Sequence, residues 1–350
     1  MYINEVAKKL ETSTRTIRYY EEKGLIDPTK EESNQYRFFE EEDLVRLSTI
    51  LSLREVGLPV EVIRNLLKEP NMRMEDYLNV QRGVLYEQWL ELKDMIETLN
   101  LMTERAGKGD NVTGDLFGLA KQLKTLKSMR KNWHDKWNFD SQAHDYDQSI
   151  KMHGYKFNVH QDYETALNKV VETVHLNPGD VCLDIGIGTG NLGSQFTGSG
   201  AKVIGVDQSE EMLAVCKEKH PGIETRKGHF LALPVMNMQV DAIVSSYALH
   251  HLTDDEKLLA LEEMDRVLKK NGEICIADLM FLNEAHRREV IQGFREQGND
   301  EAIGAIEDEY YADRSRLIDW LQKHDYTVET HQFNSILSMI YARKHAENEK

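Results

Sequence analysis

The sequence predicts a multi-domain protein of the α and α/β classes, with a winged helix-turn-helix unit, a long coiled-coil helix and a Rossmann-like doubly wound sheet in that order. Three observations predict this order. Short amphipathic segments fill the first 70 residues, leucine recurs every seven residues between 75 and 105, and strand patterns alternate with helices beyond residue 139. A chain of 350 residues is also too long for one compact core.

The composition is that of an ordinary folded protein, with 40% hydrophobic and 29% charged residues. The net charge of −17 argues against indiscriminate nucleic-acid binding, so any DNA contact must be local. No apolar run approaches the roughly 18 residues of a membrane span, and the N-terminus lacks the apolar core of a signal peptide, which predicts a cytoplasmic protein. Three cysteines lack metal-ligand spacing, so they predict no metal site and are expected to be small buried residues: Cys182, Cys216 and Cys275.

Residues 1–70 are predicted to form a winged helix-turn-helix domain. Apolar residues at helical spacing predict a helix over 3–10, and after a polar break a second helix ends at Gly24, a C-terminal glycine stop. Pro28 and the sequence TKEESNQ interrupt helicity, and the aromatic stretch 36–39 then has the strand propensity of a β-wing. A pair of helices completes the domain.

Residues 71–106 are predicted to form a dimerisation helix. Four leucines recur at strict seven-residue intervals, namely Leu78, Leu85, Leu92 and Leu99. This periodicity keeps one stripe facing a partner helix, which predicts a coiled coil. Four further side chains are expected to widen that stripe, namely Trp89, Met95, Ile96 and Met102. The alternative is an amphipathic helix that packs on its own chain.

Residues 107–138 are predicted to form a helical connector. Its apolar positions are Leu116, Leu119, Leu123 and Leu126. Its basic positions are Lys121, Lys124, Lys127, Arg130 and Lys131. We expect these basic residues to form a solvated face rather than a second DNA contact. The last domain, with its α/β alternation, covers residues 139–350.

The sequences TRTIRYYEEKGLI and QYRFF resemble the signature of the MerR family of transcription regulators. The resemblance implies a homodimer that places two recognition helices in successive major grooves of promoter DNA, where RNA polymerase also binds. It further implies DNA contacts from Arg15, Arg18 and Tyr19 in the second helix, and from Tyr36 and Arg37 in the wing. Metal-sensing relatives carry cysteines around the dimerisation helix. None occurs here, so the signal is expected to enter through the C-terminal domain.

A glycine-rich turn marks the start of the last domain. A buried-strand pattern over 181–184 is followed by GIGTGN and a helix-like segment, which lets the backbone approach a ligand at a helix N-terminus. Such a turn alone does not separate a dinucleotide from S-adenosylmethionine. The next strand, AKVIGVD, ends in Asp207, whose carboxylate can accept both ribose hydroxyls.

The sequences LDIGIGTGN, VIGVDQSEEML, GHFLALP, DAIVSSYALHHL and LKKNGEICIAD together resemble class I S-adenosylmethionine-dependent methyltransferases. The implied cofactor-binding residues are Asp184, Gly186, Gly188, Gly190, Asp207, Gln208, Met212, His229, Phe230, Ser245 and Ser246. Asp184 would anchor the amino group of the cofactor, and the three glycines would surround its methionine part. Asp207 would bind the ribose, Met212 would lie near the adenine, and the two serines would border the sulfonium.

The segment GHF departs from the family pattern, because His229 stands where an acid often binds the adenine amino group. A neutral imidazole can accept the same hydrogen bond, but in a pH-sensitive way. The backbone amide of Phe230 is the alternative adenine contact.

Methyl transfer needs an aligned nucleophile and, where the nucleophile carries a proton, a base. His250 and His251 follow the fourth strand and are the candidate catalytic residues, while Tyr146 could cover the cofactor. Alternatively, one of the two histidines has a packing role only.

Three functions remain open from the sequence. The first is an active small-molecule methyltransferase coupled to transcription, which a further resemblance favours: the stretch SSYALHHLTDDEK is similar to small bacterial methyltransferases associated with methionine and cysteine metabolism. The second is a non-catalytic sensor of S-adenosylmethionine. The third, a DNA methyltransferase, is disfavoured because the chain contains neither a Pro-Pro pair nor a Pro-Cys pair.

Overall fold

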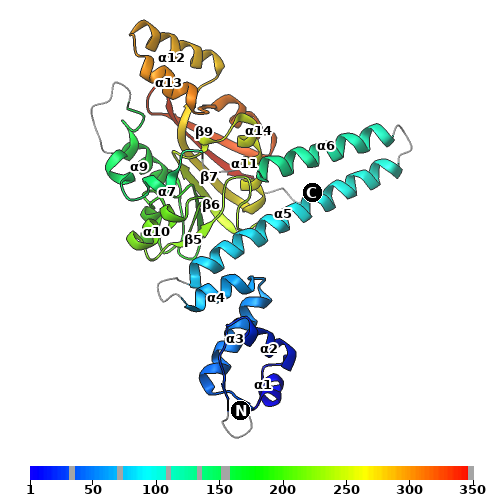
Figure 1. The fold of residues 1–350 in the computed structure, drawn as a ribbon. Coiled ribbons are helices and arrows are strands. Elements are labelled where there is room, and N and C mark those ends of the chain that lie inside the picture. Colours follow the sequence, from blue (N-terminus) through cyan, green and yellow to red (C-terminus); the bar gives the residue numbers. More distant parts are fainter. Residues whose placement is uncertain (31–35, 69–73, 108–111, 132–135, 151–157, 346–350) are drawn as a thin grey trace. The chain divides into compact units, whose positions relative to one another are not determined.

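The structure is a computed structural model that describes residues 1–30, 36–68, 74–107, 112–131, 136–150 and 158–345. The chain divides into two compact units, Met1–Val84 and Leu85–Lys350 (Figure 1). No helix among these residues is both long enough and apolar enough to cross a bilayer.

The first unit contains the predicted helices and wing. Its elements are α1 (Ile3–Lys9), α2 (Thr14–Glu22), β1 (Thr29–Lys30), β2 (Arg37–Phe38), α3 (Glu41–Glu55) and α4 (Val60–Lys68). The hydroxyl of Ser13 accepts a hydrogen bond from the backbone N–H of Thr16 and so caps α2, as a serine at this position should. Strands β1 and β2 pair antiparallel as a wing, and most of the predicted break TKEESNQ, residues 31–35, lies outside the described part of the chain.

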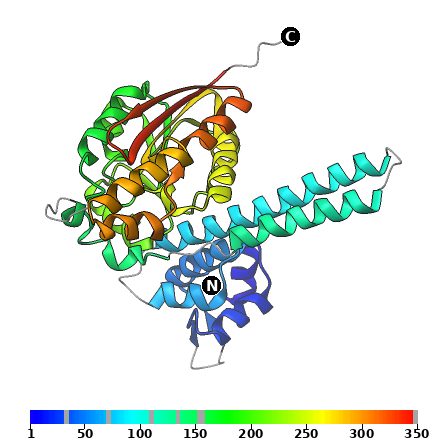
Figure 2. The ribbon, with the colours of Figure 1, turned by 90° about the horizontal axis from the view of Figure 1, so that it is seen from above.

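Helices α5 (Met74–Gly107) and α6 (Val112–Lys131) run antiparallel as a hairpin, which both views show clearly (Figure 2). The four heptad leucines of α5 are 40–59% exposed, so their own chain does not cover them. The prediction that Trp89 widens this stripe is wrong. Its ring instead packs under the guanidinium of Arg266, 5.2 Å from the ring centroid, because this side of α5 faces the second unit's own sheet domain.

The prediction of a solvated basic face on α6 is wrong for Arg130. Only 14% of its side chain is exposed, and it forms salt bridges with Asp94 on α5 and, at 3.9 Å, with Glu263. Its Nε also donates to the carbonyl of Leu231 at 2.9 Å. A sequence pattern could not separate Arg130 from the neighbouring lysines, because its partners lie 36 to 133 residues away along the chain.

The second unit is built on one mixed sheet. Its strands are β3 (Val181–Ile185), β4 (Lys202–Asp207), β5 (Glu224–Lys227), β6 (Val240–Ser246), β7 (Leu268–Phe281), β8 (Ala312–Asp313), β9 (Tyr326–Gln332) and β10 (Leu337–Lys344). Their order is β5-β4-β3-β6-β7-β10-β9, and β8 pairs with the end of β7. Strands β3 to β7 are parallel to one another, whereas β10 runs antiparallel to both of its neighbours. This is the predicted doubly wound sheet.

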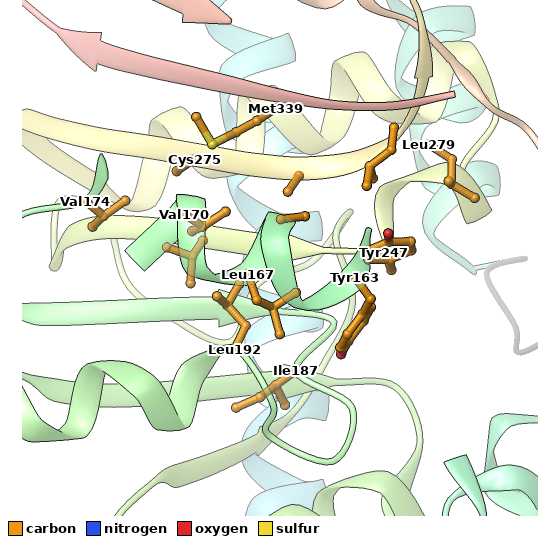
Figure 3. Close-up of a cluster of buried hydrophobic side chains, with 14 of the residues drawn as sticks. Tyr163, Leu167, Val170, Val174, Ile187, Leu192, Tyr247, Cys275, Leu279 and Met339 are labelled. Carbon is orange, nitrogen blue, oxygen red and sulfur yellow. The ribbon is translucent and has the colours of Figure 1, made fainter. Parts of the chain in front are cut away.

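Helices cover both faces of this sheet. One face carries α9 (Tyr163–Thr173), α10 (Glu210–Lys219), α12 (Glu284–Glu296) and α13 (Asp300–Asp308). The other carries α11 (Asp254–Val267) and α14 (Arg314–Lys323). Alternate strand residues face the two cores, so Cys275 of β7 lies in the same cluster as Val170 of α9 (Figure 3), whereas Ile276 packs in the other core. All three cysteines are free and buried, as predicted.

Candidate functional site

A pocket lies outside the carboxyl ends of β3, β4 and β6, where the strand order reverses and ligands bind in sheets of this kind. Its lining residues are Phe139, Tyr146, Ile185, Gly186, Gly188, Val206, Asp207, Gln208, Met212, Gly228, His229, Phe230, Tyr247, Ala248 and His251. The cavity measures only about 60 Å³. Typical ligand sites hold roughly 300–1,000 Å³, so ligand entry requires the covering side chains to move.

The glycines after β3 let two loops come together at this pocket. Gly186 has φ +72°, and a Cβ there would lie 2.4 Å from the Cβ of Ala248 in the loop after β6. Gly188 has φ +53° and open space where a side chain would be, so its backbone borders the pocket directly. Gly190 does not line the pocket, and a Cβ there would instead meet Cys216 and His220.

Asp207, at the end of β4, is held rigidly at the pocket. Its Oδ2 accepts from the N–H of Gly188 and its Oδ1 from the N–H of Ser209, both at 2.9 Å. The carboxylate therefore joins the glycine turn to the start of α10, where Gln208 and Met212 also face the pocket. The side-chain oxygen of Gln208 is buried and has no hydrogen-bond donor among the described residues.

Asp184 lies beneath the pocket rather than in its lining. It is 1% exposed, and neither carboxylate oxygen has a hydrogen-bond partner within the described ranges. Burial raises the pKa of Asp184 to about 7; the nearby backbone N–H of Gly193 opposes this rise only in part, and the charge of Asp207 adds to it. A buried carboxyl without a partner is costly to the fold, and such groups concentrate at functional sites.

Two short helices cover the pocket, α7 (Phe139–Gln142) and α8 (Tyr146–Ile150). Asp147 fastens α8 over the glycine turn, because its carboxylate accepts from Thr189 at 2.6 Å and Asn191 at 3.0 Å and pairs with Lys219. Tyr146 is thereby placed in the pocket lining, where the sequence predicted a covering residue. Asp140 fastens α7 in the same way by accepting from the hydroxyl of Ser209 at 2.6 Å.

His229 and Phe230 both line the pocket. Burial and the charge of Arg130 lower the pKa of His229 to about 3, so this imidazole is neutral over the physiological range. The prediction that a hydrogen bond accepted by His229 would be pH-sensitive is therefore wrong near neutral pH. Its Nδ1 accepts from the N–H of Leu231 at 3.3 Å, a contact that orients the ring.

Three candidate residues at the end of β6 and in the turn after it do not line the pocket, namely Ser245, Ser246 and His250. Ser245 donates to the carbonyl of Ile185 at 2.8 Å, and Ser246 is half-buried at the strand end. His250 is buried, and its Nδ1 lies 2.5 Å from the carboxylate of Asp278. Burial alone lowers the pKa of His250, but Asp278 outweighs it and raises that pKa. Asp278 also accepts from the backbone N–H groups of Ala248 and Leu249, so the pair of Asp278 and His250 holds the turn after β6 in place.

His251, in contrast, lies at the pocket and is enclosed by aromatic rings. Its ring centroid lies 4.3 Å from that of Trp137 and 5.1 Å from that of Phe139. Burial and the charge of His250 lower the pKa of His251 to about 2, and its Nδ1 is buried with no partner in the described structure. Periodicity provided no signal for these aromatic residues, because Phe139 starts the four-residue helix α7 and Trp137 and Tyr247 lie outside helices and strands.

His250, His251 and Glu309 form a group that could hold a metal ion. One ligand atom from each lies within 4.8 Å of the others, and Nε2 of His250 is 3.8 Å from Glu309. The sequence predicted no metal. Asp278 already binds Nδ1 of His250, so a metal ion is not needed to explain the position of this histidine.

The predicted DNA-contacting residues lie on one helix and the wing of the first unit. Arg15, Arg18 and Tyr19 project from α2 into solvent, while Tyr20 is buried. Tyr36 is 65% exposed on the wing. Arg37 is bound by Glu21 of α2 at 2.5 Å, a contact that holds the wing against α2.

Comparisons with known proteins also separate an N-terminal helix-turn-helix domain from the domain built on the sheet. Residues 1–70 match the model of the MerR HTH family regulatory proteins, and residues 182–272 match that of a methyltransferase domain. An uncharacterised methyltransferase of Oceanobacillus iheyensis is 34% identical over 59% of this chain and 95% of its own length. One of Alkaliphilus oremlandii is 35% identical over 59% of this chain and 95% of its own. Magnesium protoporphyrin IX methyltransferase from Synechocystis PCC 6803, solved with bound SAH, aligns at 15% identity and a TM-score of 0.45 over 59% of this chain and 96% of its own.

The pocket at the strand ends and the sheet around it define a methyltransferase domain, preceded by a helix-turn-helix domain. The chain belongs to the methyltransferase family represented by these relatives, and its N-terminal domain is of the MerR type.

Proposed function

We propose that this protein is a cytoplasmic, dimeric transcription regulator whose C-terminal domain transfers a methyl group from S-adenosylmethionine to a small molecule and couples that event to DNA binding. The observation that carries the proposal is a hydrogen bond from Arg130 of α6 to Leu231, in the segment after β5 whose preceding residues, His229 and Phe230, line the candidate cofactor pocket.

The pocket residues suit S-adenosylmethionine chemically. Asp207 presents a carboxylate to which ribose hydroxyls could donate, Gln208 has an acceptor without a donor in the described structure, and Phe230 and Met212 offer apolar surface for adenine. Asp184 would compensate the ammonium group of the cofactor. The chemistry that the cofactor supplies when bound is a methyl group on a positively charged sulfur. The residues of α7 and α8 would then exclude water from it.

Promoter binding is proposed for the first unit. Two copies of α2 would enter successive major grooves, with Arg15 and Arg18 reading base edges or clamping phosphates. The acidic net charge confines this contact to a small surface, and the four exposed leucines of α5 supply the seam between the two copies.

Coupling would pass through the segment that follows β5. Leu231 accepts from Arg130, whereas Leu233 and Val235 are bound by Glu263 and Arg266. His229 and Phe230 at the start of this segment line the pocket. A ligand that shifts this segment therefore acts on Arg130 and, through Asp94, on α5. Such a ligand changes the DNA affinity of the protein only if the α5–α6 hairpin has two arrangements and the ligand binds one of them more tightly than the other.

A pure sensor is the second candidate, and the state of His251 favours it. With a pKa of about 2, His251 is a weak base, and burial also raises the pKa of Tyr146. Neither residue would therefore be an effective general base for an acceptor that must lose a proton. Turnover of labelled S-adenosylmethionine with a panel of small nucleophiles separates the two candidates.

Replacing Asp207 with alanine is expected to weaken binding of S-adenosylhomocysteine at least roughly 100-fold, because two hydrogen bonds to a charged group are lost. Isothermal titration calorimetry measures this change. Glu218→Ala, on the exposed side of α10, is the control and should bind as wild type does. Equal affinities for wild type and Asp207→Ala would show that the cofactor lies elsewhere.

Replacing both Leu85 and Leu92 with glutamate is expected to give monomers that no longer bind operator DNA, because charges in a heptad seam repel across the interface. Light scattering and gel-shift assays report the two effects. Asn100→Glu adds a charge to the same helix beside the leucine stripe and should remain dimeric. A double variant that is still dimeric would rule out this seam.

A further inference from the structure

We propose that the cleft between α6 and the segments that carry Trp137, His251 and Glu256 binds the methyl acceptor, and that this acceptor is an organic anion carrying a flat apolar ring. The inference rests on the function proposed above and adds a substrate class to it.

The cleft has the size of a small-molecule site. Its volume is about 890 Å³, within the usual range for such sites. One wall is a single face of α6, formed by residues at helical spacing from Phe117 to Met129. The opposite wall includes Lys136, Trp137 and His251. This face of α6 is distinct from the side that packs on α5.

Positive charge gathers in the cleft although the chain as a whole carries −17. Lys121, Lys124 and Lys136 line it, and neither Lys121 nor Lys124 has a carboxylate within salt-bridge distance among the described residues. The one acidic residue in the lining, Glu256, is occupied in capping α11, where it accepts from Thr253. Unpaired lysines facing a cleft of this size favour an anionic ligand.

Apolar rings stand beside these lysines. Phe117 is 74% exposed, an unusual position for a large apolar side chain, and Trp137 also lines the cleft. An aromatic ligand would cover Phe117 or stack on Trp137, while the lysines hold its anionic group.

His251 joins the cleft to the cofactor pocket, because it lines both. The two ligands would thus meet at this residue. The neutral state of His251 suits an acceptor that arrives already deprotonated. In the transfer, a lone pair on the acceptor forms a bond to the methyl carbon while the carbon–sulfur bond breaks. Its electrons return to sulfur, so the sulfonium becomes a neutral thioether and no proton has to be removed.

The test uses the full-length protein with S-adenosylhomocysteine and two matched probes, 1-naphthoate and the uncharged 1-naphthamide. Calorimetry should show that wild type binds the anion at least tenfold more tightly than the amide. The double variant Lys121→Glu/Lys124→Glu should lose at least tenfold in affinity for 1-naphthoate. Lys323→Glu, an exposed charge reversal outside the cleft, should leave that affinity unchanged.

Equal binding of the two probes, or an unchanged affinity in the double variant, would overturn the proposal. So would a double variant whose only loss is in affinity for duplex DNA, since the lysines would then contact nucleic acid. Affinity for S-adenosylhomocysteine is measured on the same samples. If wild type fails to bind it, the proposed cofactor is wrong whatever the naphthoate result, so the two failures are distinguishable.

Discussion

Arg130→Met is expected to lower the free energy of unfolding of the methyltransferase domain by about 3–5 kcal/mol, the usual cost of removing one partner from a buried ion pair. The substitution leaves Asp94, which is 8% exposed, without its cation. It also leaves the carbonyl of Leu231 without its donor. Glu263 is affected less, because Arg266 still binds it at 2.7 Å. Thermal unfolding followed by circular dichroism measures the change.

Two further variants separate charge pairing from packing. Lys127→Met removes a positive charge from the same helix where no carboxylate partner is described, so it should change stability little. Arg130→Met combined with Asp94→Leu removes both charges and should recover most of the lost stability. If the double variant is as unstable as the single one, the Arg130–Asp94 pair is not the cause.

The single variant Arg130→Met also tests whether ligand binding is coupled to DNA binding. If the contact between Arg130 and Leu231 transmits ligand binding, Arg130→Met should retain DNA binding but lose its dependence on S-adenosylhomocysteine. By linkage, operator DNA should likewise cease to change the affinity for that ligand. A response to ligand equal to that of wild type would exclude this route.

Local sequence patterns predicted the helices, strands and turns, because each of these depends mainly on residues that are close together in the sequence. The strand that ends in Asp207, the glycine turn before it and the cap at Ser13 all lie where short-range spacing placed them. The pocket is also lined by His229 and His251, two histidines that the sequence motifs had identified as candidates.

Long-range contacts explain what the sequence did not predict. Arg130 belongs to a run of basic residues, and only the fold brings Asp94 and Glu263 to it. His250 and His251 are adjacent in sequence, yet the turn at η2 (Leu249–His251) directs one toward Asp278 and the other toward the pocket. Periodicity does not reveal which of two neighbouring side chains is buried in a turn.

Asp184→Asn is expected to stabilise the ligand-free protein at pH 8 while weakening cofactor binding. Burial raises the pKa of Asp184 from the ordinary value of 3.8 to about 7. The folded protein therefore retains a proton that the unfolded chain releases between these values, and the free energy of unfolding falls as pH rises through this window. Three units of pKa correspond to on the order of 4 kcal/mol. Asparagine has nearly the same shape and does not titrate, so it removes this cost.

The stability difference between Asp184→Asn and wild type should be small at pH 4, grow up to pH 7 and stay level above it. Chemical denaturation at a series of pH values measures it, and Asp319→Asn, at an exposed aspartate, should follow wild type throughout. The affinity for S-adenosylhomocysteine should fall in Asp184→Asn, since an amide cannot compensate the ligand's ammonium group. In wild type that affinity should rise with pH through 7, because ligand binding favours the ionised carboxyl. Parallel stability profiles for the variant and wild type would mean that Asp184 is already ionised in the ligand-free folded protein at neutral pH, which would contradict the raised pKa.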